Sequence, residues 1–166
     1  MKTNNKELSE INYKKLFNLK DKVAVITGGA GILGKEFCNG LAELGANVAV
    51  VDLLKDKASY TAKIISERYD TKAIGYGCDV SDPISVKRMV EEVVSDFGEI
   101  NILHNNAACK SDDLDAFFAP FEEYSLDQWR KVMSVNIDGF FLVAQAVGKQ
   151  MILQNKGGSI IQTASI

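Results

Sequence analysis

A short apolar run that breaks into a glycine-rich turn is the feature that most constrains the fold of this chain. Residues 23–34 read Val-Ala-Val-Ile-Thr-Gly-Gly-Ala-Gly-Ile-Leu-Gly. The apolar residues predict a buried strand, the glycines a tight turn, and the residues after them a helix. A second apolar run over 47–51 ends in Asp52. Strand, turn, helix and strand in this order predict a parallel βαβ unit.

This unit has the geometry that a dinucleotide requires. Glycines let the backbone approach a pyrophosphate, and the N-terminus of the helix stabilises its negative charge. Asp52 is placed to accept hydrogen bonds from ribose hydroxyls, and since leucines rather than cations follow it, its carboxylate favours NAD over NADP. We assign the remaining cofactor contacts here to Gly28, Gly31, Ile32, Leu33 and Gly34.

Strand and helix patterns alternate along the rest of the chain. Strands are expected near 22–27, 47–52, 72–78, 100–104 and 159–164, and helices near 32–45, 57–69, 83–97 and 125–153. Asp82 and Pro83 open the third helix and Gly98 ends it. The pattern predicts an α/β fold, a doubly wound parallel sheet of Rossmann type with strand order 3-2-1-4-5, truncated after strand 5. A ligand then binds at the carboxyl ends of the strands.

Length and composition narrow the possible partners. The 166 residues predict a 21–166 NAD-binding domain behind a 1–20 leader, in which Leu8, Ile11, Leu16 and Leu19 share one side of a helix. That leader either docks on its own fold or a neighbouring subunit, or lies on a membrane surface. A net charge of -3 argues against nucleic acid, and no apolar run suits a membrane span or signal peptide, so a cytoplasmic location is expected. Three cysteines without a C-x-x-C pair support neither a disulfide framework nor a metal site.

Five motifs in order resemble the short-chain dehydrogenase/reductase family, from about residue 18 to the last residue. They are the turn 27–34, Cys78-Asp79-Val80, Asn105-Asn-Ala-Ala108, Ser134-Val-Asn-Ile-Asp-Gly139, and the strand Gly158-Ser-Ile-Ile-Gln-Thr-Ala-Ser165. In the family the first of these segments holds the cofactor, the second contacts adenine, and the third follows strand 4. The fourth supplies an active-site asparagine, and the fifth ends in the catalytic serine.

The resemblance implies a role for each motif. Asp79, Val80, Asn106, Ala107 and Ala108 would contact the cofactor. Ser165 would donate a hydrogen bond to the substrate oxygen, and Asn136 would anchor a water that leads to the catalytic lysine. On spacing alone, Asn136 is better explained as a polar residue on a helix face. For Ser165, a strand-end hydroxyl is as good an explanation as a catalytic one. The family's Tyr-x-x-x-Lys pair would follow strand 5. We therefore expect residues 1–166 to be the N-terminal portion of an enzyme and to be inactive alone.

Two departures bear on the branch of the family. The G-x-x-G-x-x-G spacing of the turn is that of the extended branch, which includes nucleotide-sugar epimerases and dehydratases. Asn105-Asn-Ala and Asn136 belong to the compact branch, and these two motifs outweigh one turn. Ala108 stands where the family usually has glycine, which slightly crowds the nicotinamide side. His104 is expected to be structural, because no partner residue for a triad or metal site accompanies it. Cys109 is expected to be a spectator thiol, because nothing in the sequence activates it.

We therefore expect an NAD-dependent oxidoreductase that interconverts a secondary alcohol and a ketone by hydride transfer. From the cofactor turn we expect a polyol or sugar-derived substrate. The resemblance implies that the complete protein is a homo-oligomer, because in the family the helix around Phe140 packs against its counterpart. Two alternatives stay open at this point. One is a nucleotide-sugar epimerase or dehydratase, and the other is a cofactor-binding remnant without catalysis.

Overall fold

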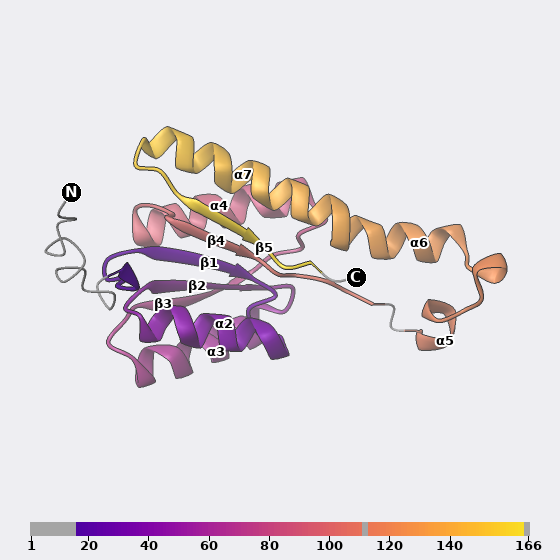
Figure 1. Cartoon of the computed structure of the whole chain (residues 1–166), viewed down its shortest axis with the longest axis horizontal. Helices are drawn as coiled ribbons and strands as arrows, with labels where there is room; N and C mark the ends of the chain where they lie inside the picture. Colours follow the sequence, from indigo (N-terminus) through magenta and orange to yellow (C-terminus); the bar gives the residue numbers. More distant parts are fainter. Residues whose placement is uncertain (1–15, 111–112, 165–166) are drawn as a thin grey trace, which may run out of the picture.

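The chain folds around one parallel sheet of five strands (Figure 1). The structure is a computed structural model that describes residues 16–110 and 113–164. The strand order is β3-β2-β1-β4-β5, which confirms the predicted doubly wound sheet. The strands are β1 (Val23–Thr27), β2 (Asn47–Asp52), β3 (Ala73–Gly77), β4 (Ile102–Asn105) and β5 (Ser159–Gln162). The winding reverses at β1, so the carboxyl ends of β1 and β4 form the switch point where ligands bind in such folds.

Helices cover both faces of the sheet. Figure 1 shows α2 and α3 on one face and α4 and α7 on the other. Side chains alternate along β1, so Val23 and Val25 pack into the core on the α4 and α7 side, while Ala24 and Ile26 pack into the core beneath α2 and α3. A strand buried on both faces is apolar throughout, as β1 is. The helices are α2 (Ile32–Glu43), α3 (Lys55–Arg68), α4 (Pro83–Phe97), α6 (Leu126–Met133) and α7 (Phe140–Gln154).

The helix ends follow the capping residues in the sequence. The Asp82 carboxylate accepts hydrogen bonds from the backbone N–H groups of Ile84 and Ser85 at 2.9 and 3.3 Å, and Gly98 ends α4 with φ of +85°. The hydroxyl of Ser125 accepts a hydrogen bond from the backbone N–H of Gln128 at 3.1 Å and so starts α6. Both starts confirm the predicted positions.

The helix predicted as continuous over 125–153 contains a π-helical turn, η3 (Ser134–Gly139), between α6 and α7. A π turn inserts one extra residue into a helix, and hydrophobic periodicity does not reveal it. Two tertiary contacts coincide with it. Gly139 lies so close to Val80 that a Cβ on it would come 2.8 Å from a Val80 methyl carbon, and the Asn136 side chain binds the loop after β4. The predicted long helix is present, and these six residues within it are π-helical.

The segment between β4 and α6 holds two short helical elements that the sequence analysis left irregular. These are α5 (Leu114–Phe117), which Asp113 caps, and the 3-10 helix η2 (Phe121–Glu123). Most of the predicted leader helix, including Leu8 and Ile11, lies outside the described residues. Leu19 packs against the core beneath α2. Within residues 16–110 and 113–164, no helix is long and apolar enough to cross a bilayer.

Candidate cofactor and active site

The glycine turn brings the end of β1 against the segment that follows β4. Gly28 has φ of +63°, and a Cβ on it would lie 3.0 Å from the Cα of Ala107. A Cβ on Gly34 would collide with the carbonyl oxygen of Gly28. The turn therefore needs glycine at both positions, at the first for its left-handed backbone and at the second for close packing. A backbone folded this tightly leaves no side chain between itself and a bound pyrophosphate.

The first turn of α2 faces this site without a cap. Gly31 is the N-cap residue, no side chain accepts a hydrogen bond there, and the first turn carries no acidic residue. The N–H groups of the first turn therefore keep their partial positive charge for an anion. Ile32 and Leu33 start the helix with side chains that are 90% and 58% exposed. The structure thus places Gly31, Ile32 and Leu33 at the uncapped start of α2, beside the glycine turn.

Asp52 lies against the glycine turn. Its Oδ2 accepts a hydrogen bond from the backbone N–H of Ala30 at 3.1 Å, and its Oδ1 accepts one from Leu54 at 3.3 Å. The backbone N–H of Gly29 donates to the carbonyl oxygen of Val51 at 2.8 Å, which fixes the turn to the end of β2. Each carboxylate oxygen has a second lone pair for another donor. The carboxylate therefore stands at the rim of the turn, where the sequence placed the ribose.

Five of the predicted cofactor residues line one cavity of about 140 Å³ at the carboxyl edge of the sheet. They are Gly28, Asp52, Asp79, Val80 and Ala107. Val80 is only 7% exposed and forms part of the core. Asp79 stands at the surface, and its Oδ1 accepts hydrogen bonds from the N–H and the hydroxyl of Ser81 at 2.9 and 2.6 Å. Residues from the ends of β1, β2, β3 and β4 thus meet at one place.

A threonine that the sequence analysis gave no role joins the two halves of this site. The Thr27 side chain is fully buried, and its hydroxyl donates to Asn105 Oδ1 at 3.0 Å. The hydroxyl oxygen of Thr27 also accepts hydrogen bonds from the backbone N–H groups of Asn106 and Ala107 at 2.9 and 3.0 Å. Asn105 in turn donates to the carbonyl oxygen of Phe140 at 2.9 Å. Thr27 therefore holds the loop after β4 beside the glycine turn.

The sequence contains a weak indication that Thr27 and Asn105 have structural partners. Thr27 and Asn105 are polar residues at the ends of otherwise apolar buried strands, and buried polar side chains need partners. Which partners they have depends on the pairing of β1 with β4, which brings residues almost eighty positions apart into contact.

A second cavity of about 550 Å³ lies on the α7 side of the β4 and β5 ends. It is lined by Asn106, Ala108 and Asn136, together with Gln162, Thr163 and Ala164 at the end of β5. The structure therefore brings the predicted asparagine together with the strand that leads to Ser165. Ser165 itself lies outside the described residues, so its catalytic role stays a prediction.

Asn136 fixes the loop after β4. Its Oδ1 accepts a hydrogen bond from the backbone N–H of Cys109 at 2.8 Å, and its Nδ2 donates to the carbonyl oxygen of the same residue at 3.0 Å. This paired contact resembles a rung of β-sheet pairing, made by a side chain. The Asn136 side chain, which lies in the π turn, thus acts first as a positioning group for the loop at Cys109.

His104 lies on the opposite face of the sheet, below α2. Its Nε2 is 3.1 Å from the hydroxyl of Thr163, and its ring packs on Phe37 with 4.1 Å between the ring centroids. Burial lowers the pKa of His104 below its ordinary value of 6.5. These contacts agree with the structural role expected for it. Within the part of the chain that the structure describes, no three His, Cys, Asp or Glu side chains converge as a metal site would require.

Comparisons with known proteins agree with this geometry. The short chain dehydrogenase family matches residues 22–166. The D-threitol dehydrogenase of Mycolicibacterium smegmatis is 39% identical over 150 residues, which are 90% of this chain and 54% of that protein. The NADP-dependent mannitol dehydrogenase of Alternaria alternata is 34% identical over 158 residues, 92% of this chain and 56% of that protein.

A solved structure gives the same answer for the fold. The crystal structure of an NAD+-bound xylitol dehydrogenase superposes with a TM-score of 0.81 at 35% identity, covering 89% of this chain and 54% of that one. The chain therefore spans little more than half the length of the relatives it matches. The match over residues 22–166, the sheet order and the meeting of the motifs at one edge lead to the same conclusion. The chain belongs to the short-chain dehydrogenase/reductase family.

Proposed function

We propose that this chain is the cofactor-binding portion of an NAD-dependent oxidoreductase that interconverts a secondary alcohol and a ketone. The observation that carries the proposal is the position of the Asp52 carboxylate, 3.1 Å from the N–H of Ala30 in the glycine turn and on the wall of the same cavity as Gly28. A phosphate on the ribose 2′-oxygen would meet a negative charge there, whereas a free hydroxyl would find an acceptor.

The residues present fit a dinucleotide. A Cβ at Gly28 or Gly34 would fill the space beside the turn, and the uncapped start of α2 offers N–H groups to a pyrophosphate. Asp52 would hold the adenosine ribose, Asp79 and Val80 would border the adenine, and Asn106, Ala107 and Ala108 would border the nicotinamide half. The cofactor supplies a hydride acceptor or donor when it is bound.

The second cavity is suited to the reacting end of the substrate. Asn136 fixes the backbone at Cys109 and so shapes the wall that includes Ala108. We assign to Ser165 the hydroxyl that donates a hydrogen bond to the oxygen of the alcohol or ketone. A polyol or sugar-derived substrate is supported by the names of the relatives, a D-threitol and a mannitol dehydrogenase.

Assembly of the complete protein as a homo-oligomer is part of the proposal. Apolar side chains along η3 and α7 face solvent: Ile137 is 59% exposed, Phe141 61% and Ile152 79%. Exposed apolar residues clustered along one element favour burial against a second subunit. Sedimentation of the complete protein tests this, and a monomer at all concentrations would contradict it.

Calorimetric titration of the chain with NAD+ and NADP+ tests the cofactor assignment directly, without turnover. NAD+ should bind at least about tenfold more tightly than NADP+, because the Asp52 carboxylate accepts a hydrogen bond from the 2′-hydroxyl of NAD+ but repels the 2′-phosphate of NADP+. Gly34→Ala is the matched negative control, because its Cβ would collide with the turn. Equal or tighter binding of NADP+ would overturn the choice of NAD, and binding of neither would overturn the proposed function.

A further inference from the structure

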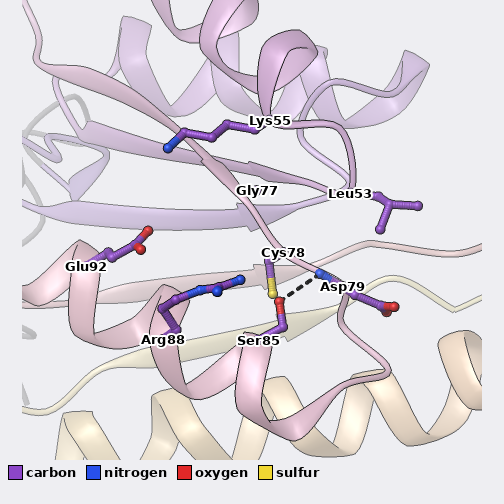
Figure 2. Close-up of a pocket in the computed structure, with 8 residues that line it drawn as sticks. All are labelled: Leu53, Lys55, Gly77, Cys78, Asp79, Ser85, Arg88 and Glu92. Carbon is purple, nitrogen blue, oxygen red and sulfur yellow. Dashed lines mark hydrogen bonds between the residues drawn. The ribbon is translucent and has the colours of Figure 1, made fainter.

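A further cavity, distinct from the one at Asn136, adjoins the 140 Å³ cavity that contains Gly28 and Asp52. It measures about 490 Å³ and lies between the start of α3, the end of β3 and the first turns of α4 (Figure 2). Leu53, Cys78 and Asp79 line both cavities. The larger cavity and the proposed adenosine site therefore share these three residues.

Two cations line the larger cavity. Lys55 comes from α3 and Arg88 from α4, on opposite sides of the end of β3 (Figure 2). Over residues 16–110 and 113–164, neither forms an ion pair or a side-chain hydrogen bond. Glu92 also lines the cavity, one turn beyond Arg88 and outside ion-pair distance. Both cations thus keep their attraction for an anion that enters the cavity.

Asp79 sets the direction in which an adenine would face. Its Oδ1 is used by Ser81, while its Oδ2 has no hydrogen bond within the described ranges. Asp79 lines both cavities, and this oxygen is an acceptor only. In NAD+ the N9 atom of the adenine is bonded to the ribose, so the 6-amino group is the part of the adenine that donates N–H hydrogen bonds. With the ribose at Asp52, the amino edge therefore turns towards Asp79 and the larger cavity.

We propose that the cavity between Lys55 and Arg88 accommodates a substituent on the adenine 6-amino group, and that it favours one ending in a carboxylate. A secondary amine keeps one N–H for Asp79 and sends its substituent into the larger cavity. The two unpaired cations then attract a carboxylate at the end of that arm and repel an ammonium. The inference rests on the proposed binding of NAD.

Calorimetry with the chain and three probes tests it: NAD+, N6-carboxymethyl-NAD+ and N6-(2-aminoethyl)-NAD+. The carboxymethyl analogue should bind at least as tightly as NAD+ and about threefold or more tightly than the aminoethyl analogue, the size expected for exposed charges. Raising the salt concentration should shrink that ratio.

Variants assign the effect to the cavity. Arg88→Ala and Lys55→Ala should each lower the carboxymethyl to aminoethyl ratio by about twofold or more. Lys87→Ala is the matched control, since Lys87 neighbours Arg88 on α4, pairs with Glu91 and does not line the cavity. Arg88→Trp fills the cavity and should weaken both analogues more than NAD+.

The outcomes separate the inference from the proposed function. If NAD+ binds but the carboxymethyl analogue binds more than about tenfold more weakly, the cavity does not take the substituent and the inference is wrong. If both analogues bind and their ratio does not change in Arg88→Ala and Lys55→Ala, the charge preference is wrong. If NAD+ itself does not bind, the proposed function falls, and the inference falls with it.

Discussion

The Asp52 carboxylate accepts a hydrogen bond from the backbone N–H of Ala30 at 3.1 Å, so the residue that ends β2 is joined directly to the turn that ends β1. In this position one side chain serves two purposes. It fixes the turn, and under the proposed function it presents negative charge where a ribose 2′-substituent would lie. Loss of the carboxylate should therefore affect both the order of the turn and the choice of cofactor.

Asp52→Ala should lower the ratio of NAD+ to NADP+ affinity by roughly tenfold, because it removes an acceptor for the ribose hydroxyl and a repulsive charge. Leu53→Arg should shift the ratio in the same direction by adding a cation for the 2′-phosphate. Calorimetric affinities of the chain for both cofactors measure this. Asp56→Ala, which removes an acidic residue from the first turn of α3, is the control. An unchanged ratio in Asp52→Ala would separate Asp52 from the ribose.

Thr27→Val should reduce the free energy of unfolding by about 2–4 kcal/mol, because it leaves buried partners on Asn105, Asn106 and Ala107 without their hydrogen bonds. Thr27→Ser keeps the hydroxyl and should cost less than half as much. Urea denaturation of the three proteins provides the comparison. Equal losses for the valine and serine variants would contradict a dominant contribution of the hydroxyl.

Gly34→Ala should destabilise the chain by at least about 2 kcal/mol and abolish NAD+ binding, because its Cβ would overlap the Gly28 carbonyl. Gly40→Ala offers a matched comparison on the same helix, since a Cβ at Gly40 meets nothing within 4 Å. That variant should stabilise the chain by about 1 kcal/mol through helix propensity. Thermal unfolding and cofactor titration of the pair measure both effects. Equal behaviour of the two variants would rule out the close approach at Gly34.

His104 predicts a pH dependence of stability. Burial holds its pKa in the folded chain below the ordinary value of 6.5, so the unfolded chain binds more protons between these two values. The free energy of unfolding should therefore fall as the pH drops below 6.5. It should level off once the pH is below the folded-state pKa. His104 is the chain's one histidine, so urea denaturation of His104→Gln should lack this component. An identical pH profile in that variant would contradict the prediction.

Ser165→Ala should lower turnover by about 10²-fold with little change in NAD+ affinity, the effect of removing one donor to a developing oxyanion. The measurement needs a protein in which this chain is extended by the family's Tyr-x-x-x-Lys segment. Ser159→Ala, at the other end of β5, is the control and should leave turnover unchanged. Full activity in Ser165→Ala would remove the serine from the active site.

Local patterns predicted most of the fold. The apolar runs gave the five strands, Asp82 and Gly98 gave the ends of α4, and the rule for right-handed crossovers gave the sheet order. The motif spacing also placed Gly28, Asp52 and Val80 on one cavity. These features depend on neighbours in sequence or on general rules of chain connection.

What the sequence did not reveal depends on contacts between distant segments. The hydrogen bonds of Thr27 and the π turn at Asn136 arise only when β4 lies beside β1 and the loop after β4 meets α7. Helix propensity carries no information about one extra residue inserted into a helix. The role of Ser165 and the division of the chain at residue 20 stay predictions.

The bonds from Thr27 to Asn106 and Ala107 have a consequence for the order of folding. They close across 79 and 80 positions of the chain, so the wall of the site cannot form while β1 and β2 pair alone. Contacts of such sequence separation form late, because a long loop must be closed first. During synthesis, the turn would be complete only after β4 has emerged and docked. A nucleotide that binds to this wall would therefore stabilise the assembled sheet, but not the partly folded states in which β4 has not yet docked.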